Sequence, residues 1–425
     1  MKKVEKINKV SSESKKSSSM PLIILIIILV SMGQSVYWQT MPVIGRELGF
    51  EVWQITSMVS ISAAMFLFFT PYWGRLSDRK GRKIILMIGL SGYVLSTFLF
   101  IVLAYYGLNG YFSLGFLFVI LLLARMVNSV VAAASRPATG AYVADITTET
   151  ERTAGMGKLG AANNQGTILG PLLVAIVAPL LADQTFLSVD LQHYARLIPL
   201  GIMSVLMLIG VFFVFFYLPE SNNLKVNKKE ENKQLLDKDL KILMLSGVLI
   251  FVAFAMTQSV TAFFIQDRFL YSPLETQTRQ AWALGTLALS SILIQLTFIQ
   301  KVKGPPVSLI KLSIPFFVIS ALLIIYSSSM NWYLAGMAFM GLGMGMAAPG
   351  YTSSASLKAN KNNQGAVIGL AFAAPALGFT IGPMLSGLMY EFSPTLPFWF
   401  IIPMFLIVFL LTFFFKDSSS EEDMV

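Results

Sequence analysis

The sequence GRLSDRKGRK at residues 74–83 decides the class of fold. It separates two apolar runs, 53–74 and 84–105, and each run is long enough to cross the hydrocarbon layer of a bilayer. Basic residues stand at positions 75, 79, 80, 82 and 83. Charge of this density between two spans predicts a loop, and the positive-inside tendency places that loop in the cytoplasm. A basic loop that only sets the orientation of the chain is the simpler interpretation of the same segment.

The overall composition is that of a polytopic membrane protein. Of 425 residues, 55% are hydrophobic and 12% are charged, and the mean hydropathy is +0.70. A soluble monomer needs more charged side chains to cover its surface. The net charge of +9 comes from basic residues scattered in short loops, without the aromatic-interleaved basic domain that tracks a nucleic acid. The absence of cysteine excludes disulfides, thiolate metal sites and cysteine nucleophiles.

Apolar runs predict twelve transmembrane helices, because a helix needs about 20 mostly apolar residues to cross the bilayer core. The predicted spans lie near residues 21–42, 53–74, 84–105, 112–136, 155–180, 197–218, 241–265, 279–299, 307–328, 331–353, 365–389 and 396–415. Between the sixth and seventh spans, the polar segment 219–240 is expected to be a cytoplasmic linker. It joins two predicted six-helix bundles, 21–218 and 241–415. The predicted fold is therefore an all-α membrane protein in two halves.

The orientation follows from the distribution of Lys and Arg. With the polar tails 1–20 and 416–425 in the cytoplasm, the basic residues other than Arg125 and a few outer arginines lie on or near the cytoplasmic side. Both termini are therefore expected in the cytoplasm, in a multi-pass arrangement.

An internal repeat relates the two predicted halves at an offset of 212 residues. At this offset, Pro137, just after the fourth span, coincides with Pro349 in the tenth. In the fifth and eleventh spans, the matched pairs are Gly157 with Gly369, Gly166 with Gly378, Gly170 with Gly382, and Pro171 with Pro383. Transporters built from parallel repeats have this pattern and place the substrate site at the interface between the halves. A chance match of common membrane Gly and Pro residues is the alternative.

The basic segment also resembles a known motif. The pattern Gly-x-Leu-x-Asp-Arg-x-Gly-Arg-Lys is similar, at every fixed position, to the loop between helices two and three of the major facilitator superfamily of secondary transporters. The resemblance implies conformational roles for Gly74, Asp78, Arg79, Gly81 and Arg82. Asp78 is expected to pair with the N-terminus of helix eleven or with Arg152 when the protein opens outward.

Two further motifs resemble the drug-proton antiporter branch of that superfamily. The sequence GTILGP, which begins at Gly166 and ends at Pro171, resembles its fifth-helix signature, in which small residues allow close packing and proline introduces a kink. Residues 137–155, with Asp145 and Arg152, look like its junction of helices four and five. The resemblance implies gating roles for Asp145, Arg152, Gly166, Gly170 and Pro171 and, through the repeat, for Gly378, Gly382 and Pro383. A simple packing face is the alternative interpretation of the glycines.

Arg125 is a charged residue near the middle of the fourth predicted span, where insertion costs about 2.5–3.5 kcal/mol and charge is usually functional. It resembles the family's buried arginine, which is thought to assist proton transfer. Asn128 and Ser129 depart from that motif, which usually has Gln and Gly. A structural arginine satisfied by carbonyls or by Asn128 is the alternative. Asp267, at the outer end of the seventh span, is a candidate proton acceptor or a solvated loop anion.

Polar and soft side chains indicate where a substrate would bind. On a major-facilitator layout, helices one, four, seven and ten line the central cavity. The candidate residues on these helices, with one amide of helix five, are Gln34, Trp38, Asn128, Asn163, Phe254, Gln258, Met340 and Met344. Amides, aromatics and methionines suit an amphipathic organic ligand. Hydrogen bonding between helices is the alternative role of each amide. No Asp or Glu lies securely in the middle of a span, which favours a neutral or anionic substrate over a lipophilic cation.

The resemblance therefore implies an exporter of a small organic compound that works by alternating access, and we expect it to be driven by protons and to work as a monomer in a bacterial inner or plasma membrane. A dedicated exporter of one metabolite such as a siderophore, a proton-coupled importer and a transporter-like sensor remain open. The segment at 155–159 lacks the residues of a nucleotide-binding phosphate loop, and His193 has no second His or Cys nearby. No enzyme activity, cofactor, metal or nucleic-acid partner is expected.

Overall fold

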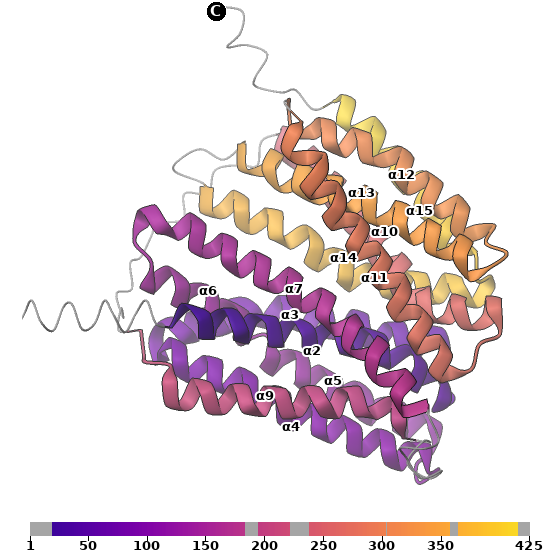
Figure 1. Cartoon of the computed structure of the whole chain (residues 1–425), viewed down its shortest axis with the longest axis horizontal. Helices are drawn as coiled ribbons and strands as arrows, with labels where there is room; N and C mark the ends of the chain where they lie inside the picture. Colours follow the sequence, from indigo (N-terminus) through magenta and orange to yellow (C-terminus); the bar gives the residue numbers. More distant parts are fainter. Residues whose placement is uncertain (1–18, 183–193, 222–237, 303, 358–363, 415–425) are drawn as a thin grey trace, which may run out of the picture. The chain divides into compact units, whose positions relative to one another are not determined.

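The computed structural model describes residues 19–182, 194–221, 238–302, 304–357 and 364–414 (Figure 1). Every regular element in these ranges is a helix. Nearly all of the predicted tails and most of the predicted linker lie outside the described residues, as does His193.

The chain forms two compact units. The first contains Met1–Phe50 and Ala64–Lys228, and the second contains Glu51–Ala63 and Lys229–Val425. The helices of the first unit are α2 (Met20–Glu47), most of α3 (Val52–Lys80), α4 (Arg82–Leu108), α5 (Leu114–Ala132), α6 (Ser135–Ile146), α7 (Glu149–Ala182) and α9 (Ile198–Tyr217), with a short 3-10 turn at Ala195–Leu197. Those of the second are α10 (Lys238–Phe269), α11 (Pro273–Thr297), α12 (Val307–Ile325), α13 (Met330–Leu357), α14 (Gln364–Phe392) and α15 (Leu396–Phe413), with a 3-10 turn at Ile299–Lys301.

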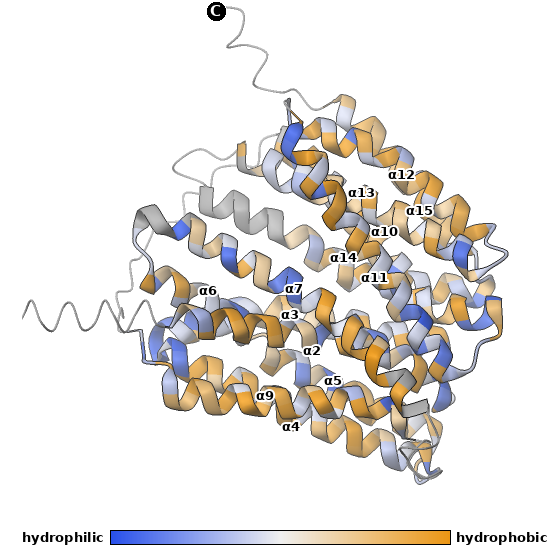
Figure 2. Cartoon of the chain, in the orientation of Figure 1, coloured by the Kyte–Doolittle hydropathy of each residue, from blue (hydrophilic) through white to orange (hydrophobic). Residues whose placement is uncertain are grey.

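Each of the twelve predicted spans corresponds to one helix, except the fourth. The fourth corresponds to α5 and α6, which together form the span Leu114–Ile146. Nine spans in the described part of the chain are long and apolar enough to cross a membrane. The Gly-containing helices α7, α13 and α14 complete the twelve. Helix α9 shows how an outer helix meets lipid: it is apolar along most of its length (Figure 2), and its exposed residues include Phe212, Phe213 and Phe216.

The predicted loop at 74–83 is wrong in its extent. Helix α3 continues to Lys80, and α4 begins at Arg82, so Gly81 alone breaks the helix. Gly81 has a φ of +105°, a conformation that side chains with a Cβ rarely adopt. Arg79 and Lys80 lie in the last turn of α3, where cations are favoured by the helix dipole. The densely charged segment is therefore helical, and it continues α3 beyond its apolar part.

The inner end of the fourth span also differs from the prediction. The helix was expected to end at residue 136, before Pro137, but it continues as α6 to Ile146. Pro137 has no N–H to complete the helical hydrogen-bond ladder, and the chain bends after α5. The indole Nε1 of Trp73 donates to the carbonyl of Val130 at 2.6 Å, so a side chain of α3 satisfies a backbone group beside the bend. Arg136 is consequently followed by ten further helical residues of α6.

The repeat is visible in how helices pack within each unit. Helix α7 packs along α2 in the first unit, and α14 packs along α10 in the second. A Cβ on Gly170 would lie 2.6 Å from Cβ of Ser35, and a Cβ on Gly382 would lie 2.9 Å from Cβ of Ala255. The matched glycines therefore let each helix pair approach backbone to backbone. Their contact partners are offset by 220 residues instead of 212, because the segments between the paired helices differ in length.

Candidate functional site

Arg125 is the centre of a buried polar network in the first unit. Its side chain is 5% exposed, and Nη1 donates to Oδ1 of Asn128 at 2.8 Å. The amide of Asn128 donates in turn to the hydroxyls of Ser96 at 2.8 Å and Thr97 at 3.3 Å. Helix α5 therefore fixes the guanidinium against α4 through neutral partners. Asn128, predicted as a substrate contact, is fully buried in this network.

Aromatic rings cover the other side of Arg125. The guanidinium carbon lies 4.2 Å from the centroid of Tyr37, a residue of α2 that is 1% exposed. Tyr37 meets the rings of Tyr93 and Phe100 edge to face, at 6.1 and 5.6 Å. A cation over a buried ring is attracted by the ring quadrupole, which offsets part of the loss of solvation. The structure thus shows how a charge inside the span is accommodated, and sequence reasoning missed both tyrosines.

The other predicted substrate residues of the first unit differ in their surroundings. Gln34 and Trp38 are partly exposed on one face of α2, at helical i, i+4 spacing. Asn163 of α7 accepts a hydrogen bond from the hydroxyl of Ser31 at 2.8 Å. This contact lies beside the Gly166 interface, so the amide of Asn163 helps to join α7 to α2. The roles of Gln34 and Trp38 in binding remain predictions.

In the second unit, Phe254 and Gln258 are partly exposed on α10, and the ring of Phe254 meets Phe379 of α14 edge to face at 6.3 Å. Met340 is fully buried and Met344 is 7% exposed. Neither methionine presents an appreciable surface to a ligand in this structure. Their predicted contact with substrate would need a rearrangement of α13.

The basic turn after α3 joins four segments of the first unit. Arg82 forms an ion pair with Asp78, one turn before it, and its Nε donates to Oδ2 of Asp145 on α6 at 3.2 Å. The hydroxyl of Ser221, which follows α9, donates to the same oxygen of Asp145 at 2.8 Å. The predicted gating residues Asp78, Arg82 and Asp145 are therefore brought together. We refer to Asp78, Arg82, Asp145, Glu220 and Ser221 as the inner cluster.

Arg152, the predicted outward partner of Asp78, is placed differently. Its Nη2 donates to the carbonyl of Ala144 at 3.3 Å, and in this structure Asp78 pairs with Arg82. The Asp78 side chain stays 53% exposed, so it can accept from a further partner. Exchange of Asp78 to another partner remains a prediction.

Glu220, which is distant from α4 in the sequence, caps the N-terminus of this helix. Gly81 stands at the N-cap position and has no side chain to accept from the first N–H groups of the helix. Oε1 of Glu220 accepts from the backbone N–H of Arg82 at 2.6 Å and of Lys83 at 3.2 Å. The carboxylate also favours the positive end of the helix dipole. Sequence analysis assigned Glu220 to the solvated linker and so missed this contact.

Replacement of Glu220 is expected to weaken the inner cluster. In Glu220→Ala the two N–H groups lose their acceptor, at a cost of about 1 kcal/mol, typical of a lost cap. Glu220→Gln keeps an amide oxygen and is expected to lose less. Thermal unfolding of the purified variants in detergent is followed by intrinsic fluorescence. We expect the melting temperature to fall in the order wild type, Glu220→Gln, Glu220→Ala. A melting temperature of Glu220→Ala equal to that of wild type would remove Glu220 from the cluster.

The predicted outer acceptor, Asp267, is exposed on α10 and hydrogen bonded. The hydroxyl of Tyr390 on α14 donates to its Oδ2 at 2.7 Å. The next residue of α14, Glu391, accepts from the backbone N–H of Trp53 at 3.2 Å. The bond from Tyr390 joins Asp267 to α14. The proton-accepting role of Asp267 remains a prediction.

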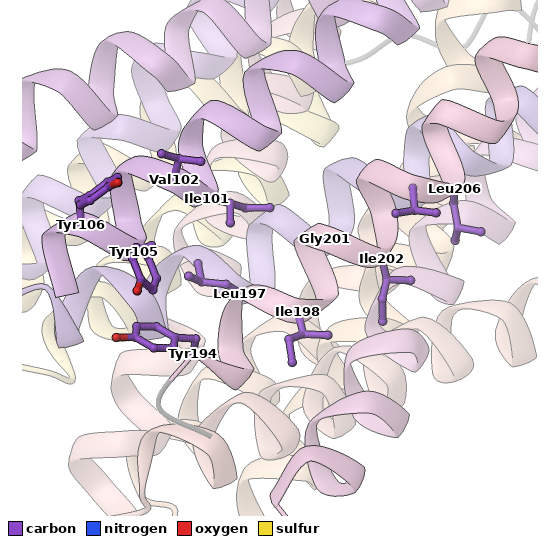
Figure 3. Close-up of a pocket in the computed structure, with 11 residues that line it drawn as sticks. Ile101, Val102, Tyr105, Tyr106, Tyr194, Leu197, Ile198, Gly201, Ile202 and Leu206 are labelled. Carbon is purple, nitrogen blue, oxygen red and sulfur yellow. The ribbon is translucent and has the colours of Figure 1, made fainter. Parts of the chain in front are cut away.

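An apolar groove of about 710 Å³ lies between α4 and α9 (Figure 3). Tyr105, Tyr106 and Tyr194 line one end of it, and aliphatic side chains such as Ile198 and Ile202 line the rest. The rings of Tyr105 and Tyr194 are 4.7 Å apart. The groove has no charged lining residue, so it lacks the polar groups that would orient a polar substrate. None of the residues that line the groove belongs to the Arg125 network.

The comparisons with known proteins agree with this architecture. A family model described as the Major Facilitator Superfamily matches residues 23–374 and 304–423. Multidrug resistance protein 2 of Bacillus subtilis (strain 168) is 27% identical over 404 residues, which cover 91% of this chain and 90% of that protein. Quinolone resistance protein NorA of Staphylococcus aureus is 24% identical over 369 residues, which cover 85% and 87%.

A solved structure shows the same fold. The bacterial homolog to the human lysosomal transporter Spinster, in an inward-facing and occupied conformation, aligns with a TM-score of 0.71 at 14% identity, over 94% of this chain and 96% of that one. The helical architecture, the repeated glycine contacts and the family match lead to one conclusion: this chain belongs to the major facilitator superfamily of membrane transporters.

Proposed function

We propose that this transporter exports a small organic compound across the cytoplasmic membrane and that inward proton movement drives the export. The observation that carries the proposal is the network around Arg125, a charge held inside a span by neutral partners. Intramembrane charges are costly and mark substrate pathways or proton relays. Two relatives of similar length are named for resistance to multiple drugs and to quinolones, which supports export as the direction.

The matched glycine contacts support alternating access. Gly170 and Gly382 hold α7 on α2 and α14 on α10, so each unit has one closely packed helix pair. Transporters with repeats move largely by rocking of such rigid bodies around a substrate site. The protein works as a monomer with both termini in the cytoplasm, and the inner cluster lies on the cytoplasmic side.

The substrate class follows from the charges of the spans. Neither the Arg125 network nor the central part of any span contains an Asp or Glu. A lipophilic cation bound in the membrane would be stabilised by a buried acid, whereas a neutral or anionic compound needs donors. A dedicated exporter of a carboxylate-rich metabolite, such as a metallophore, is therefore the second candidate beside a multidrug exporter.

Efflux from cells separates these two candidates. In a strain that lacks its own exporters, we expect the protein to release an endogenous carboxylate metallophore and to move ethidium weakly, because ethidium finds no acid in the spans. Extracellular metallophore and cell-associated ethidium fluorescence are measured with and without a protonophore. Strong, proton-dependent ethidium efflux that is abolished in Gln34→Ala would contradict the prediction and favour the multidrug exporter.

A further inference from the structure

The first unit holds a second arginine within a span, and it differs from Arg125 in every contact. Arg136 lies in the first turn of α6, ten residues before the span ends at Ile146, which is about 15 Å of helix rise. Its guanidinium carbon is 5.3 Å from the ring centroid of Phe66. Phe66 is the central residue of the 29-residue helix α3. The cation therefore contacts the apolar part of α3, while the backbone beside it lies level with Gly74, because a Cβ built on Gly74 would be 3.6 Å from Cβ of Pro137.

Within the described part of the chain, the guanidinium of Arg136 has a ring contact but no ion pair or hydrogen bond. The ion pairs between described residues join Arg82 to Asp78 and Asp145, and Arg196 to Glu47. None of them, and none of the hydrogen bonds of the described side chains, uses the guanidinium of Arg136. Arg125, by contrast, is buried and donates to Asn128.

The surroundings of Arg136 are open. Its side chain is exposed, and a Cβ built on Gly140, one turn further along α6, would meet no atom within 4 Å. Arg136 and Gly140 share a face of the helix because they are four residues apart. A charged side chain on an open face of a span lines water or a polar ligand, since hydrocarbon cannot solvate it. We therefore expect this face of α6 to line water or a polar ligand.

We propose that Arg136, held over the ring of Phe66, binds the anionic group of the transported compound. The inference rests on the transport function proposed above and specifies its substrate class: a small organic anion with a carboxylate, sulfonate or phosphate group. A guanidinium presents a planar fork of N–H donors that matches such a group with two parallel hydrogen bonds. The cation–π contact with Phe66 fixes the position of the guanidinium. Phe66 is thus a positioning residue.

Two dyes with the same ring system and opposite charge test the proposal. Carboxyfluorescein is an anion and rhodamine 123 is a cation, and both are xanthenes of similar size. The full-length protein in nanodiscs of zwitterionic phosphatidylcholine is titrated against each dye, with fluorescence anisotropy as the readout. We expect wild type to bind carboxyfluorescein and Arg136→Gln to bind it about tenfold or more weakly, as for loss of hydrogen bonds between charged groups. Rhodamine 123 binding is expected to stay equal or to increase.

Matched variants separate binding from folding. Arg136→Lys keeps the charge without the fork, and Phe66→Leu keeps the arginine without the ring, so both should lie between wild type and Arg136→Gln for the anion. Lys241→Gln removes an exposed charge at the start of α10 and should bind both dyes as wild type does. The melting temperature of every variant is recorded. If Arg136→Gln does not fold, the comparison of Arg136→Lys and Phe66→Leu with wild type carries the test.

The outcomes distinguish this proposal from the proposed function. Equal binding of carboxyfluorescein by wild type and Arg136→Gln, or no binding by wild type, overturns the role of Arg136. A parallel loss of both dyes in Arg136→Gln also overturns it, because the effect would then be independent of ligand charge. If the dye binds through Arg136 but proteoliposomes never move it against a gradient, the site stands and proton-driven export fails.

Discussion

Arg125→Ala is expected to abolish transport against a gradient while downhill exchange of substrate continues. The variant removes the single charge of the buried network, which joins α5 to α4 through Asn128 and to α2 through the ring of Tyr37. The amide oxygen of Asn128 would be left buried without its donor, at a cost of about 1–3 kcal/mol. If this charge governs protonation during the cycle, its loss uncouples proton movement from substrate movement.

Arg125→Lys is the matched comparison. Lysine keeps the charge but lacks the planar group that lies over Tyr37 and donates to Asn128, so we expect partial uphill transport and partial exchange. Uptake into proteoliposomes with an imposed pH gradient measures the uphill rate, and counterflow at equal pH measures exchange. An Arg125→Ala protein that accumulates substrate as well as wild type would make Arg125 a purely structural residue.

Asp78→Asn is expected to reduce transport about tenfold or more with nearly normal expression, an estimate based on the loss of one charged hydrogen bond. The fold should survive because Arg82 keeps its bond to Asp145, and Glu220 still caps α4. The Asp78 carboxylate is half-exposed beside its ion pair with Arg82. An exposed charge at a helix junction can exchange partners as the protein opens, and asparagine cannot form those ion pairs.

Asp78→Glu provides the control, because it keeps the charge on a longer side chain and should retain part of the activity. Transport rates are normalised to the amount of protein in the membrane, and melting temperature reports the fold. Wild-type rates in Asp78→Asn would show that the inner cluster is a static contact. A low rate that is fully explained by poor expression would also count against a gating role.

The helices could be predicted from the sequence because the length of an apolar run is a direct measure of a membrane span. The repeat was also visible, since Gly170 and Gly382 must recur at fixed places for two helix pairs to approach closely. Resemblance to two separate motifs named Asp78, Arg82 and Asp145 as gating residues, but their contacts with one another were not predicted. Composition alone would not have joined α3 to α6.

The contacts that were missed depend on tertiary structure. Glu220 looks like the first acid of a polar linker, and only the fold brings it to the N–H groups of Arg82 and Lys83. Arg136 is the last residue of the predicted fourth span, 112–136, and was assigned no role. In this span the helix resumes, with Trp73 bonded to Val130 beside the bend. Tyr37 belongs to an apolar face that has no distinguishing pattern in the sequence.

The central claim is that proton movement drives a small organic compound through this protein, and proton flux tests it most directly. Purified protein is reconstituted into liposomes that contain a pH-sensitive dye, and a panel of candidate anions and cations is added one at a time. We expect an anionic compound to cause proton movement in wild type, and we expect Arg125→Ala to exchange the same compound without moving protons. Transport of that compound by wild type at a rate unaffected by the pH gradient, with no accompanying proton flux, would contradict it.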